Sequence, residues 1–309
     1  MHVNVHVNVH DRAALLARCT FPPAGTSVDC AVSGGADSLA LLALAVSAGC
    51  RATAIHVDHG LRHGSAREAD LVEAAATQLG AEFRSAQVQV AQGPNLEARA
   101  RAARYAALPA DVLTGHTADD QAETLLVNLL RGAASSGLGG MRPGTRRPIL
   151  ALRRQKTEQL CAELGLTVFH DPSNDDPRHV RNRVRHELLP LMAAISQRDP
   201  VPVLVRQADI ARADADLLDE LATEIDPRDA RSLANAPIAL ARRAVRRWLS
   251  GDHPPDAATV ERVLAVARGE TAATDVGEGQ SVRRSQQRLT IVRTAAVHSV
   301  PTTKPLPSE

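Results

Sequence analysis

A short glycine-containing segment, Ser33-Gly34-Gly35-Ala36-Asp37-Ser38, constrains the fold of this chain more than any other. An apolar run at 28–32 precedes it and predicts a buried strand, and a second apolar run at 39–46 predicts a helix that covers that strand. Glycines allow a sharp turn and a close approach of the backbone to a ligand. Free N–H groups at the start of the following helix favour an anion. Strand, turn and helix together therefore predict a phosphate site.

The aspartate of this segment indicates a metal ion beside the phosphates. A carboxylate repels phosphate unless a cation lies between them, and Mg²⁺ usually binds through one or two carboxylates together with substrate phosphates. Asp37 is therefore a candidate Mg²⁺ ligand, and Ser33 and Ser38 add hydroxyl donors. A glycine turn with an aspartate cap is the simpler interpretation. The fixed order of two glycines, serine, aspartate and serine favours the phosphate site.

The segment is neither a Walker A loop nor a dinucleotide-binding turn. Neither Lys156 nor Lys304 follows a glycine, and the spacing G-x-G-x-x-G does not occur in it. The segment resembles instead the PP-loop, SGGxDS, of the ATP pyrophosphatases. That resemblance implies an enzyme that splits ATP into AMP and pyrophosphate in order to adenylate a substrate.

The composition bounds what the chain can be. With 309 residues and a hydrophobic fraction of 44%, it can form one large or two modest domains with a sizeable core. Only five residues are aromatic, so base-stacking platforms are not expected, and a net charge of +1 does not by itself indicate nucleic-acid binding. No signal peptide or membrane span is recognisable. A reduced, cytoplasmic chain is predicted because no C-x-x-C pair occurs among Cys19, Cys30, Cys50 and Cys161.

Strand-like and helix-like patterns alternate after the glycine turn. Apolar segments at 52–57, 86–90 and 111–114 predict three more strands, and helical patterns separate them. Such alternation predicts an α/β fold with a doubly wound, mainly parallel sheet. From about residue 197 the patterns become helical. We therefore expect an ATP-binding catalytic domain at 1–196 and a smaller, mostly helical domain with a loose C-terminal tail at 197–309.

Three polar segments fall at the carboxyl ends of predicted strands, where such sheets bind ligands: Ser33–Ser38, His56–Arg62 and Gly115–Asp120. We expect them to form one active site. Two adjacent acids, Asp119 and Asp120, begin a helix; capping accounts for one of them and leaves the other for a metal or a substrate. Zinc is not expected, because no further ligand follows in order after His56, His59 and His63.

Arginines recur in the second half of this domain. Six of them surround a glycine-serine segment at 132–144, which is either a mere linker or, with these arginines, a lid or a contact with RNA phosphates. The six are Arg131, Arg142, Arg146, Arg147, Arg153 and Arg154. Four more arginines follow further along the chain. Arginines spaced by two on a helix point around it, so some of them are expected to face inward toward the acids. The simpler interpretation is a plain basic helix on the surface. This second group is Arg178, Arg181, Arg183 and Arg185.

The second domain carries no recognisable chemistry and suits substrate recognition. Helical patterns lie at 203–224, 238–249 and 257–268, and strand patterns at 280–284 and 289–293 predict a closing hairpin. A basic stripe on the predicted helix at 238–249 consists of Arg242, Arg243, Arg246 and Arg247.

Several motifs in fixed order resemble the tRNA(Ile)-lysidine synthetases, and the combination is far more specific than the PP-loop alone. They cover about residues 28–190. The segments are Ser33–Ser38, His56–Arg62, Asn95–Tyr105, Gly115–Thr124, Arg131–Met141 and Asp171–His186.

This resemblance implies an enzyme that uses ATP to adenylate the wobble cytidine of isoleucine tRNA with a CAU anticodon. The amine of L-lysine then displaces AMP and forms lysidine. ATP and Mg²⁺ are the implied cofactors, and tRNA and L-lysine are the implied partners. A homodimer is one option for assembly, and no membrane partner is implied.

The resemblance also implies roles for individual residues. Asp37 and Asp120 would position Mg²⁺ and the reacting groups, and the PP-loop would hold the pyrophosphate part of ATP. The residues expected to contact ATP are Ser33, Gly34, Gly35, Ala36, Asp37, Ser38 and His56. The charge on the activated intermediate would be stabilised by one of three arginines, with Arg183 favoured over Arg181 and Arg185.

Other functions stay open at this point. A PP-loop tRNA 2-thiolation enzyme needs paired cysteines for sulfur transfer or an iron–sulfur cluster, and no such pair occurs. A PP-loop amidotransferase needs a glutaminase domain, and position 2 is His instead of a nucleophilic Cys. A non-catalytic RNA-binding protein would not need Asp37, Ser38 and Asp120.

Overall fold

The computed structural model describes residues 9–58, 65–88, 99, 102–103, 106–251 and 254–293. The chain forms two compact units, Met1–Arg212 and Ala213–Glu309, and each is described by itself. Some predicted features lie outside the described residues in whole or in part: the segment His59–His63, the motif at 95–105 and the end of the loose C-terminal tail, from residue 294.

The boundary between the units lies inside α10 (Val201–Leu221), further along the chain than residue 196. The first unit contains all the residues predicted to contact ATP or metal. The extents of a catalytic and a tRNA-recognition domain stay predictions. None of the helices within the described ranges is long and apolar enough to cross a membrane.

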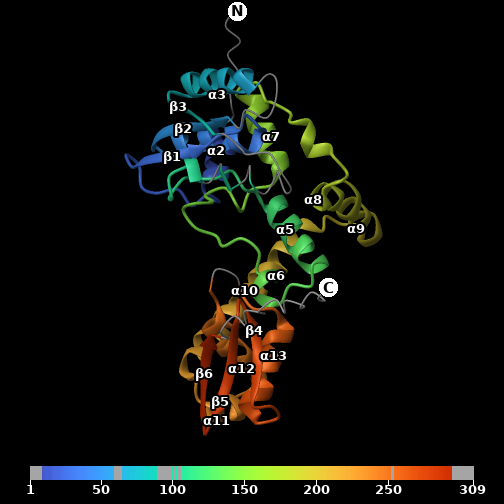
Figure 1. The fold of residues 1–309 in the computed structure, drawn as a ribbon. Coiled ribbons are helices and arrows are strands. Elements are labelled where there is room, and N and C mark those ends of the chain that lie inside the picture. The colour runs from blue at the N-terminus through green and yellow to red at the C-terminus, as the bar shows by residue number, and fades with distance from the viewer. Residues whose placement is uncertain are drawn as a thin grey trace, which may run out of the picture. The chain divides into compact units, whose positions relative to one another are not determined.

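Three parallel strands form the sheet of the first unit, in the order β1 (Ser27–Ala31), β2 (Arg51–Asp58) and β3 (Glu82–Gln87). Two helices, α2 (Ala36–Ser47) and α3 (Ser65–Leu79), connect successive strands and pack against the sheet (Figure 1). The prediction of a parallel α/β fold is confirmed.

The two outer segments of this sheet differ from the sequence-based prediction. β3 begins at Glu82 instead of residue 86, because exposed polar side chains hide the apolar pattern of this edge strand. The segment at 111–114 forms a single parallel bridge, from Leu113 to Cys30, instead of a full strand. It lies beside β1 on the side opposite β2, so the sheet order reverses next to β1. Doubly wound sheets bind ligands at such a reversal.

α2 is apolar around its whole circumference and is therefore buried. α7 (Arg154–Glu163) packs beside it. The side chains of α2 that are at most 1% exposed include Leu39, Leu41, Leu42 and Leu44. The turn Ser33–Ser38 lies at the N-terminus of this helix, so the core fixes its position. Within the turn, Gly34 has a φ of +84°, and a Cβ there would lie 3.3 Å from the Cβ of Phe169, so the position requires glycine.

A second apolar cluster joins the segments that carry the acids and arginines. In it, α5 (Ala118–Leu130) packs against α8 (Val180–Arg183), the π-helical turn Val184–Leu188 and the start of α10. This packing brings the 181–185 segment to the first turn of α5. The remaining helical segments of the unit are α1 (Val9–Leu16), α6 (Ser135–Leu138), a 3-10 turn (Pro172–Asp175) and α9 (Leu189–Ser196).

The second unit packs helices against a small antiparallel sheet. The predicted helices at 238–249 and 257–268 are confirmed as α12 and α13, and the predicted hairpin is confirmed as the last two strands. One strand was not predicted, because it is short and has no buried apolar side chain. The elements are a 3-10 turn (Ala222–Glu224), α11 (Ala230–Asn235), α12 (Ile238–Leu249), α13 (Ala257–Arg268), β4 (Ala273–Gly277), β5 (Gln280–Ser285) and β6 (Arg288–Arg293).

The enclosure of α2 leads to a stability prediction. Leu41→Ala should lower the free energy of unfolding by about 2–5 kcal/mol, because it deletes a fully buried side chain and leaves a cavity. Leu129→Ala, the same substitution at a side chain that is 55% exposed, should change it by less than about 0.5 kcal/mol. Urea denaturation followed by circular dichroism measures both, and equal losses would contradict the assignment of α2 to the core.

Candidate active site

The turn Ser33–Ser38, the candidate phosphate site, is held by its own serines. The Oγ of Ser38 donates to the carbonyl of Gly35 at 2.8 Å, and the backbone N–H of Ser33 donates to that Oγ at 3.2 Å. α2 begins immediately after Gly35. The turn is therefore ordered at a helix N-terminus, which is the arrangement that binds phosphate groups.

Asp120 has two separate environments, one for each carboxylate oxygen. Its Oδ2 accepts from the backbone N–H of Thr117 at 2.8 Å and from the Thr117 hydroxyl at 2.9 Å, which closes the first turn of α5. Its Oδ1 accepts from Arg154 at 3.0 Å and from Arg181 at 2.9 Å. Asp120 thus caps its helix and also faces the site.

The neighbouring acid, Asp119, faces a different partner. It makes a bidentate pair with Arg153, with both contacts at 3.0 Å, and accepts from the backbone N–H of Arg154 at 2.8 Å. The sequence predicted that one of the two acids would cap the helix and the other would be left for metal or substrate. In the structure Asp120 does the capping through one oxygen and keeps the other for the site, whereas Asp119 orients the start of α7.

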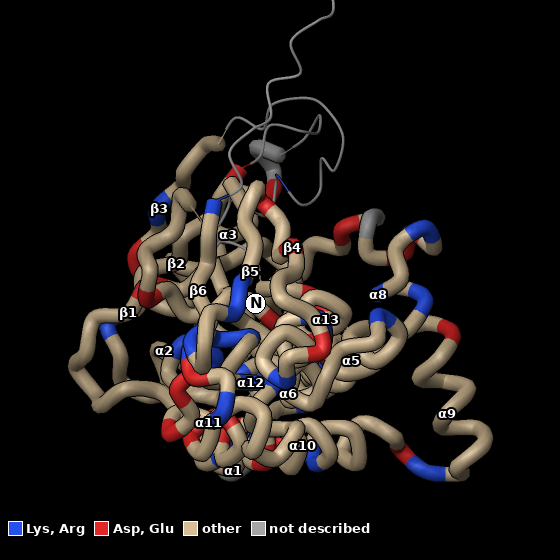
Figure 2. The backbone as a smooth tube through the Cα atoms, turned by 60° about the horizontal axis from the view of Figure 1, so that its bottom comes forward, with Lys and Arg blue, Asp and Glu red and all other residues tan. Residues whose placement is uncertain are grey.

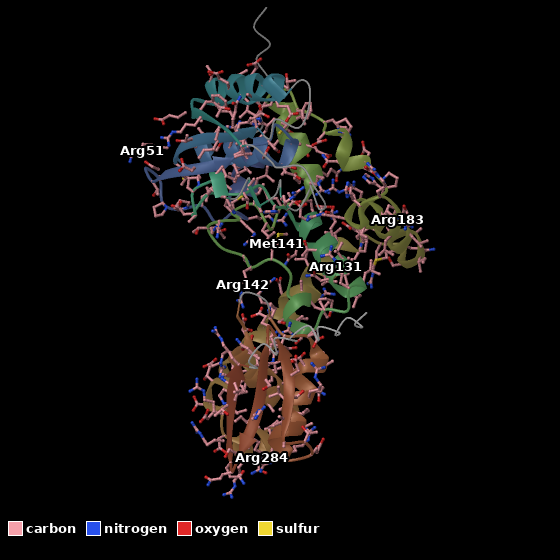
Figure 3. The ribbon with its side chains drawn as sticks, in the orientation of Figure 1. Arg51, Arg131, Met141, Arg142, Arg183 and Arg284 are labelled. Atoms are coloured by element: carbon pink, nitrogen blue, oxygen red, sulfur yellow. The ribbon has the colours of Figure 1, made fainter. Side chains whose placement is uncertain are left out.

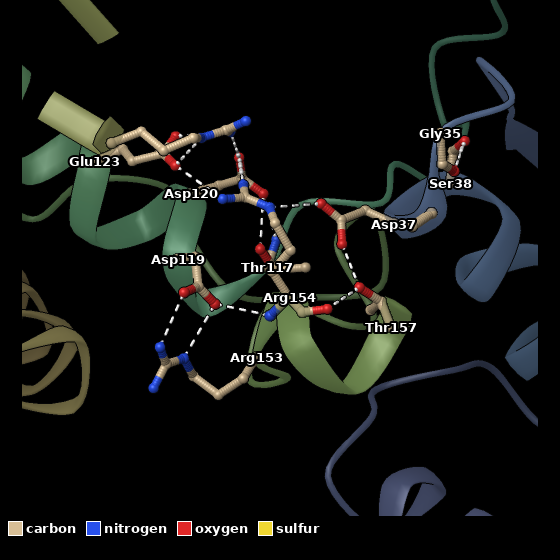
Figure 4. A network of polar contacts seen from close by, with 12 residues as sticks. Gly35, Asp37, Ser38, Thr117, Asp119, Asp120, Glu123, Arg153, Arg154 and Thr157 are labelled. Carbon is tan, nitrogen blue, oxygen red and sulfur yellow. Dashed lines mark hydrogen bonds and ion pairs between the residues drawn. The ribbon is translucent and has the colours of Figure 1, made fainter. Parts of the chain in front are cut away.

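Three carboxylates meet at the guanidinium of Arg154, at the start of α7 (Figure 4). Its Nε lies 3.2 Å from Asp37 Oδ2, its Nη2 lies 3.0 Å from Asp120 Oδ1 and its Nη1 lies 3.0 Å from Glu123 Oε1. The other oxygen of Asp37 accepts from the hydroxyl of Thr157, one turn further along α7. The structure therefore brings Asp37 and Asp120 together, as the sequence predicts.

Glu123 is a central residue that the sequence-based prediction missed. Its side chain is fully buried and accepts from Arg154 at 3.0 Å, from Arg181 at 2.7 Å and from Arg185 at 2.7 Å. Glu123 lies three residues after Asp120, so both project from one face of α5. That spacing could have identified it. No comparable signal marks Arg154, because a basic residue at the start of a short helix is ordinary.

The pKa values of two acids of the site shift in opposite directions. Burial raises the pKa of Asp37 to about 6, and the nearby carboxylate of Asp120 adds to that rise, although Arg154 and Thr157 oppose it. Burial also acts to raise the pKa of Asp120, but Arg154, Arg181 and the Thr117 N–H together hold it below its usual range. Asp120 therefore stays ionised near neutral pH, whereas Asp37 gains or loses its proton at a pH of about 6.

Arg183 lies apart from these acids. Its guanidinium pairs with Glu187 at 2.8 Å, and both side chains are more than half exposed. Figure 3 shows Arg183 at the outer margin of its segment. Of the three arginines considered from the sequence, the structure brings Arg181 and Arg185 to the carboxylates and does not bring Arg183 there.

His56 supports the turn from behind. It is 3% exposed on β2, and its Nδ1 lies 3.0 Å from the carbonyl of Val32, the residue that precedes the turn. This contact fixes the backbone that leads into the loop. A direct contact of His56 with nucleotide stays a prediction.

The glycine-serine segment at 132–144 is held by side chains of α5 and α10. Gln121 bonds to both the N–H and the carbonyl of Met141, at 2.8 and 3.1 Å, and Arg212 donates to the same carbonyl at 3.1 Å. Arg131, which precedes the segment, and Arg142, which lies within it, are exposed (Figure 3). The expected contact with RNA phosphates stays a prediction.

The donor set suits a hard divalent cation. Asp37 and Asp120 direct oxygen atoms at one cation, the Arg154 guanidinium, so the two carboxylates can share a charge between them. Oxygen ligands of this kind are those that Mg²⁺ prefers. Within the described residues, no group of three or more histidines, cysteines or acids is arranged to hold a metal ion, so Asp37 and Asp120 would supply only part of its ligands.

Comparisons with known proteins agree with this geometry. Residues 11–192 match the family model of the PP-loop domain, and residues 229–290 match that of the TilS substrate binding domain. The chain is 40% identical over 299 residues to the tRNA(Ile)-lysidine synthase of Nocardia farcinica, with 89% of this chain and 94% of that protein covered. It is 41% identical over 273 residues to the tRNA(Ile)-lysidine synthase of Thermobifida fusca, with 80% and 84% covered.

Among solved structures, the U34-tRNA thiolase NcsA from Methanococcus maripaludis superposes with a TM-score of 0.52 at 15% identity, over 66% of this chain and 79% of that one. This similarity concerns the fold alone. The fold and the phosphate-binding turn define an ATP-utilising enzyme of the PP-loop class. Within that class, the chain belongs to the tRNA(Ile)-lysidine synthase family, and the family predicted from the sequence is confirmed.

The raised pKa of Asp37 predicts how stability depends on pH. A carboxyl whose pKa is higher in the folded chain stabilises the fold when protonated, and this contribution is lost as pH rises from about 4 through about 6. Asp37→Asn removes the titration. Its free energy of unfolding relative to the unchanged chain should therefore increase by about 1–2 kcal/mol between pH 5 and pH 8.

Asp119→Asn is the matched control for that measurement. Burial opposes the charge of Asp119, but Arg153 and the N–H of Arg154 hold its pKa below the usual range. Its stabilising contribution is present above pH 4 and is lost only as pH falls further. The deficit of Asp119→Asn should hence stay constant from pH 5 to pH 8. A flat difference for Asp37→Asn over the same interval would contradict the raised pKa.

Proposed function

We propose that this chain is a tRNA(Ile)-lysidine synthase, a ligase that forms a carbon–nitrogen bond. ATP adenylates the wobble cytidine of isoleucine tRNA with a CAU anticodon and releases pyrophosphate. The amine of L-lysine then displaces AMP and forms lysidine. The observation that carries the proposal is the meeting of PP-loop Asp37 with Asp120 and Glu123 of α5 at the end of β1.

The residue roles follow from that arrangement. The turn Ser33–Ser38 binds the pyrophosphate part of ATP through its N–H groups and hydroxyls. Asp37 and Asp120 hold Mg²⁺, which neutralises phosphate charge when bound. Through its contact with Val32, His56 keeps the backbone before the turn in place. It is also the proposed contact of β2 with the nucleotide. These assignments are supported by the convergence of the two acids and by the order of the turn.

Charge on the activated intermediate needs a positioned cation. Arg183 is the residue favoured at the level of the sequence among the three arginines that the resemblance implies, and its exposed position leaves it accessible to RNA. Arg181 and Arg185 are the alternatives, because Glu123 already holds both of them beside Asp120. An arginine that is oriented before the substrate arrives needs little reorganisation during the reaction.

The second unit is the proposed tRNA-recognition module. Basic positions recur on α12, as Figure 2 shows in blue, and Arg242 and Arg246 are exposed there. Exposed arginines suit contacts to RNA phosphates, which supply affinity without reading sequence.

We also propose L-lysine as the nucleophile, a cytoplasmic location and a homodimer. The exposed Leu191 and Ile195 on α9 favour a second copy of the chain.

The cysteines argue against sulfur transfer. All four are free, and burial raises the pKa of Cys19 to about 11 and those of Cys30 and Cys161 to about 12. A thiol with such a pKa stays protonated near neutral pH and is a poor nucleophile. The 2-thiolation alternative therefore has no support from these side chains.

The direct test combines purified protein, ATP, labelled lysine and transcripts of isoleucine and methionine tRNA that carry the CAU anticodon. Label should enter only the isoleucine transcript, in an ATP-dependent reaction that releases AMP. Asp37→Ala should abolish incorporation and leave tRNA binding intact, because the change lies at the phosphates. Undiminished incorporation by Asp37→Ala would refute the site assignment, and AMP release without incorporation would reopen the identity of the nucleophile.

A second experiment ranks the arginines. Arg183→Ala should change the melting temperature little, because an exposed ion pair contributes little to stability. A role for Arg183 in charge stabilisation predicts a fall in kcat of about 10²–10³ for this variant. Unchanged kcat in Arg183→Ala, together with a loss of that size in Arg185→Ala, would move the role to Arg185.

A further inference from the structure

Arg154 occupies the position that a metal ion would need. Each nitrogen of its guanidinium contacts a different acid: Nε contacts Asp37, Nη2 contacts Asp120 and Nη1 contacts Glu123 (Figure 4). The side chain is 19% exposed. One guanidinium therefore contacts three acids at the place where the proposed Mg²⁺ ligands converge, and Arg181 and Arg185 add positive charge beside two of them.

The oxygen atoms that remain for a cation are those that Arg154 holds. Asp37 Oδ1 is bound by the Thr157 hydroxyl, and Asp120 Oδ2 is bound by the N–H and hydroxyl of Thr117. This leaves Asp37 Oδ2 and Asp120 Oδ1, and both accept from Arg154. Asp120 Oδ1 also accepts from Arg181 at 2.9 Å, so Arg154 is the cation that the two oxygens share. A metal ion that bridges the two acids must share or take over these two contacts.

We propose that the guanidinium of Arg154 and a divalent cation compete for Asp37 and Asp120, so that Arg154 sets the metal affinity of the site. This inference rests on the proposed role of the two acids as Mg²⁺ ligands. Two like charges within a few ångströms repel each other strongly in a partly buried site. Binding of the divalent cation therefore drives the guanidinium away from Asp37 and Asp120.

The surrounding charges permit this exchange. Glu123, the third acid on Arg154, also pairs with Arg181 and Arg185 at 2.7 Å, so its buried carboxylate stays neutralised when Arg154 moves. The partial exposure of Arg154 gives its long side chain a path to solvent. The exchange replaces one cation by another at the two aspartates and leaves no buried acid without a partner.

Manganese binding tests the competition without reference to catalysis. Electron paramagnetic resonance of Mn²⁺, titrated with protein in the absence of nucleotide, gives the dissociation constant directly. Arg154→Gln should bind Mn²⁺ at least about tenfold more tightly than the unchanged chain, which corresponds to about 1.4 kcal/mol. Arg154→Lys keeps the charge and should restore most of the weaker binding.

Arg153→Gln is the matched control, since it removes the same charge from the adjacent residue, which pairs with Asp119 and Asp199 instead of the three acids. It should change the dissociation constant by less than about twofold, because its charge does not face Asp37 or Asp120. Equal or weaker Mn²⁺ binding by Arg154→Gln, or equal tightening by Arg153→Gln, overturns the competition. If neither the unchanged chain nor any of these variants binds Mn²⁺, the assignment of the two acids as Mg²⁺ ligands is overturned, and the competition with it.

A measurement on the unchanged chain covers the case in which Arg154→Gln fails to fold. The Nε–H proton of Arg154, which is bonded to Asp37, should give a protected signal in ¹⁵N nuclear magnetic resonance, assigned by its disappearance in Arg154→Lys. Saturating Mg²⁺ should shift this signal and speed its exchange with water. A signal that Mg²⁺ leaves unchanged overturns the proposal.

Discussion

The burial of the Glu123 carboxylate is the constraint on which the active site depends. A fully buried anion is costly unless several donors neutralise it, and here three arginines do so. Those arginines come from the start of α7, from α8 and from the π-helical turn after it. One side chain of α5 thereby holds the start of α7 and the contiguous segment of α8 and the π-helical turn in place, although both lie far from Glu123 in the chain.

The same requirement explains the division of labour between neighbouring residues. Arg181 and Arg185 are four residues apart and both reach Glu123, whereas Arg183 between them projects outward to Glu187. Asp119 and Asp120 are adjacent and likewise face different partners. Side chains on successive residues of a helix point in different directions, so only some members of each motif can belong to the site.

The sequence was most informative where structure is local. The turn Ser33–Ser38, its strand and its helix can be predicted from apolar runs around two glycines. The bounds of β1 and α2 in the structure lie within three residues of the predicted bounds. The sequence predicts the start of edge strand β3 at residue 86 instead of Glu82, because the exposed polar residues of this strand hide its apolar alternation. Arg154 and Glu123 were missed because their roles arise from partners distant in the chain, which no local pattern reports.

The contrast between short-range and long-range contacts has a consequence for the order of folding. β1, α2 and β2 are consecutive in the chain, and their contacts close short loops. The bond from Arg154 to Asp37 joins residues 117 positions apart, and that from Arg185 to Glu123 spans 62. Closing long loops costs more entropy and slows contact formation. We therefore expect the turn Ser33–Ser38 and its flanking strands and helix to form early in folding, and the ion pairs of Arg154 and Arg185 to form later, when their helices pack against α2 and α5.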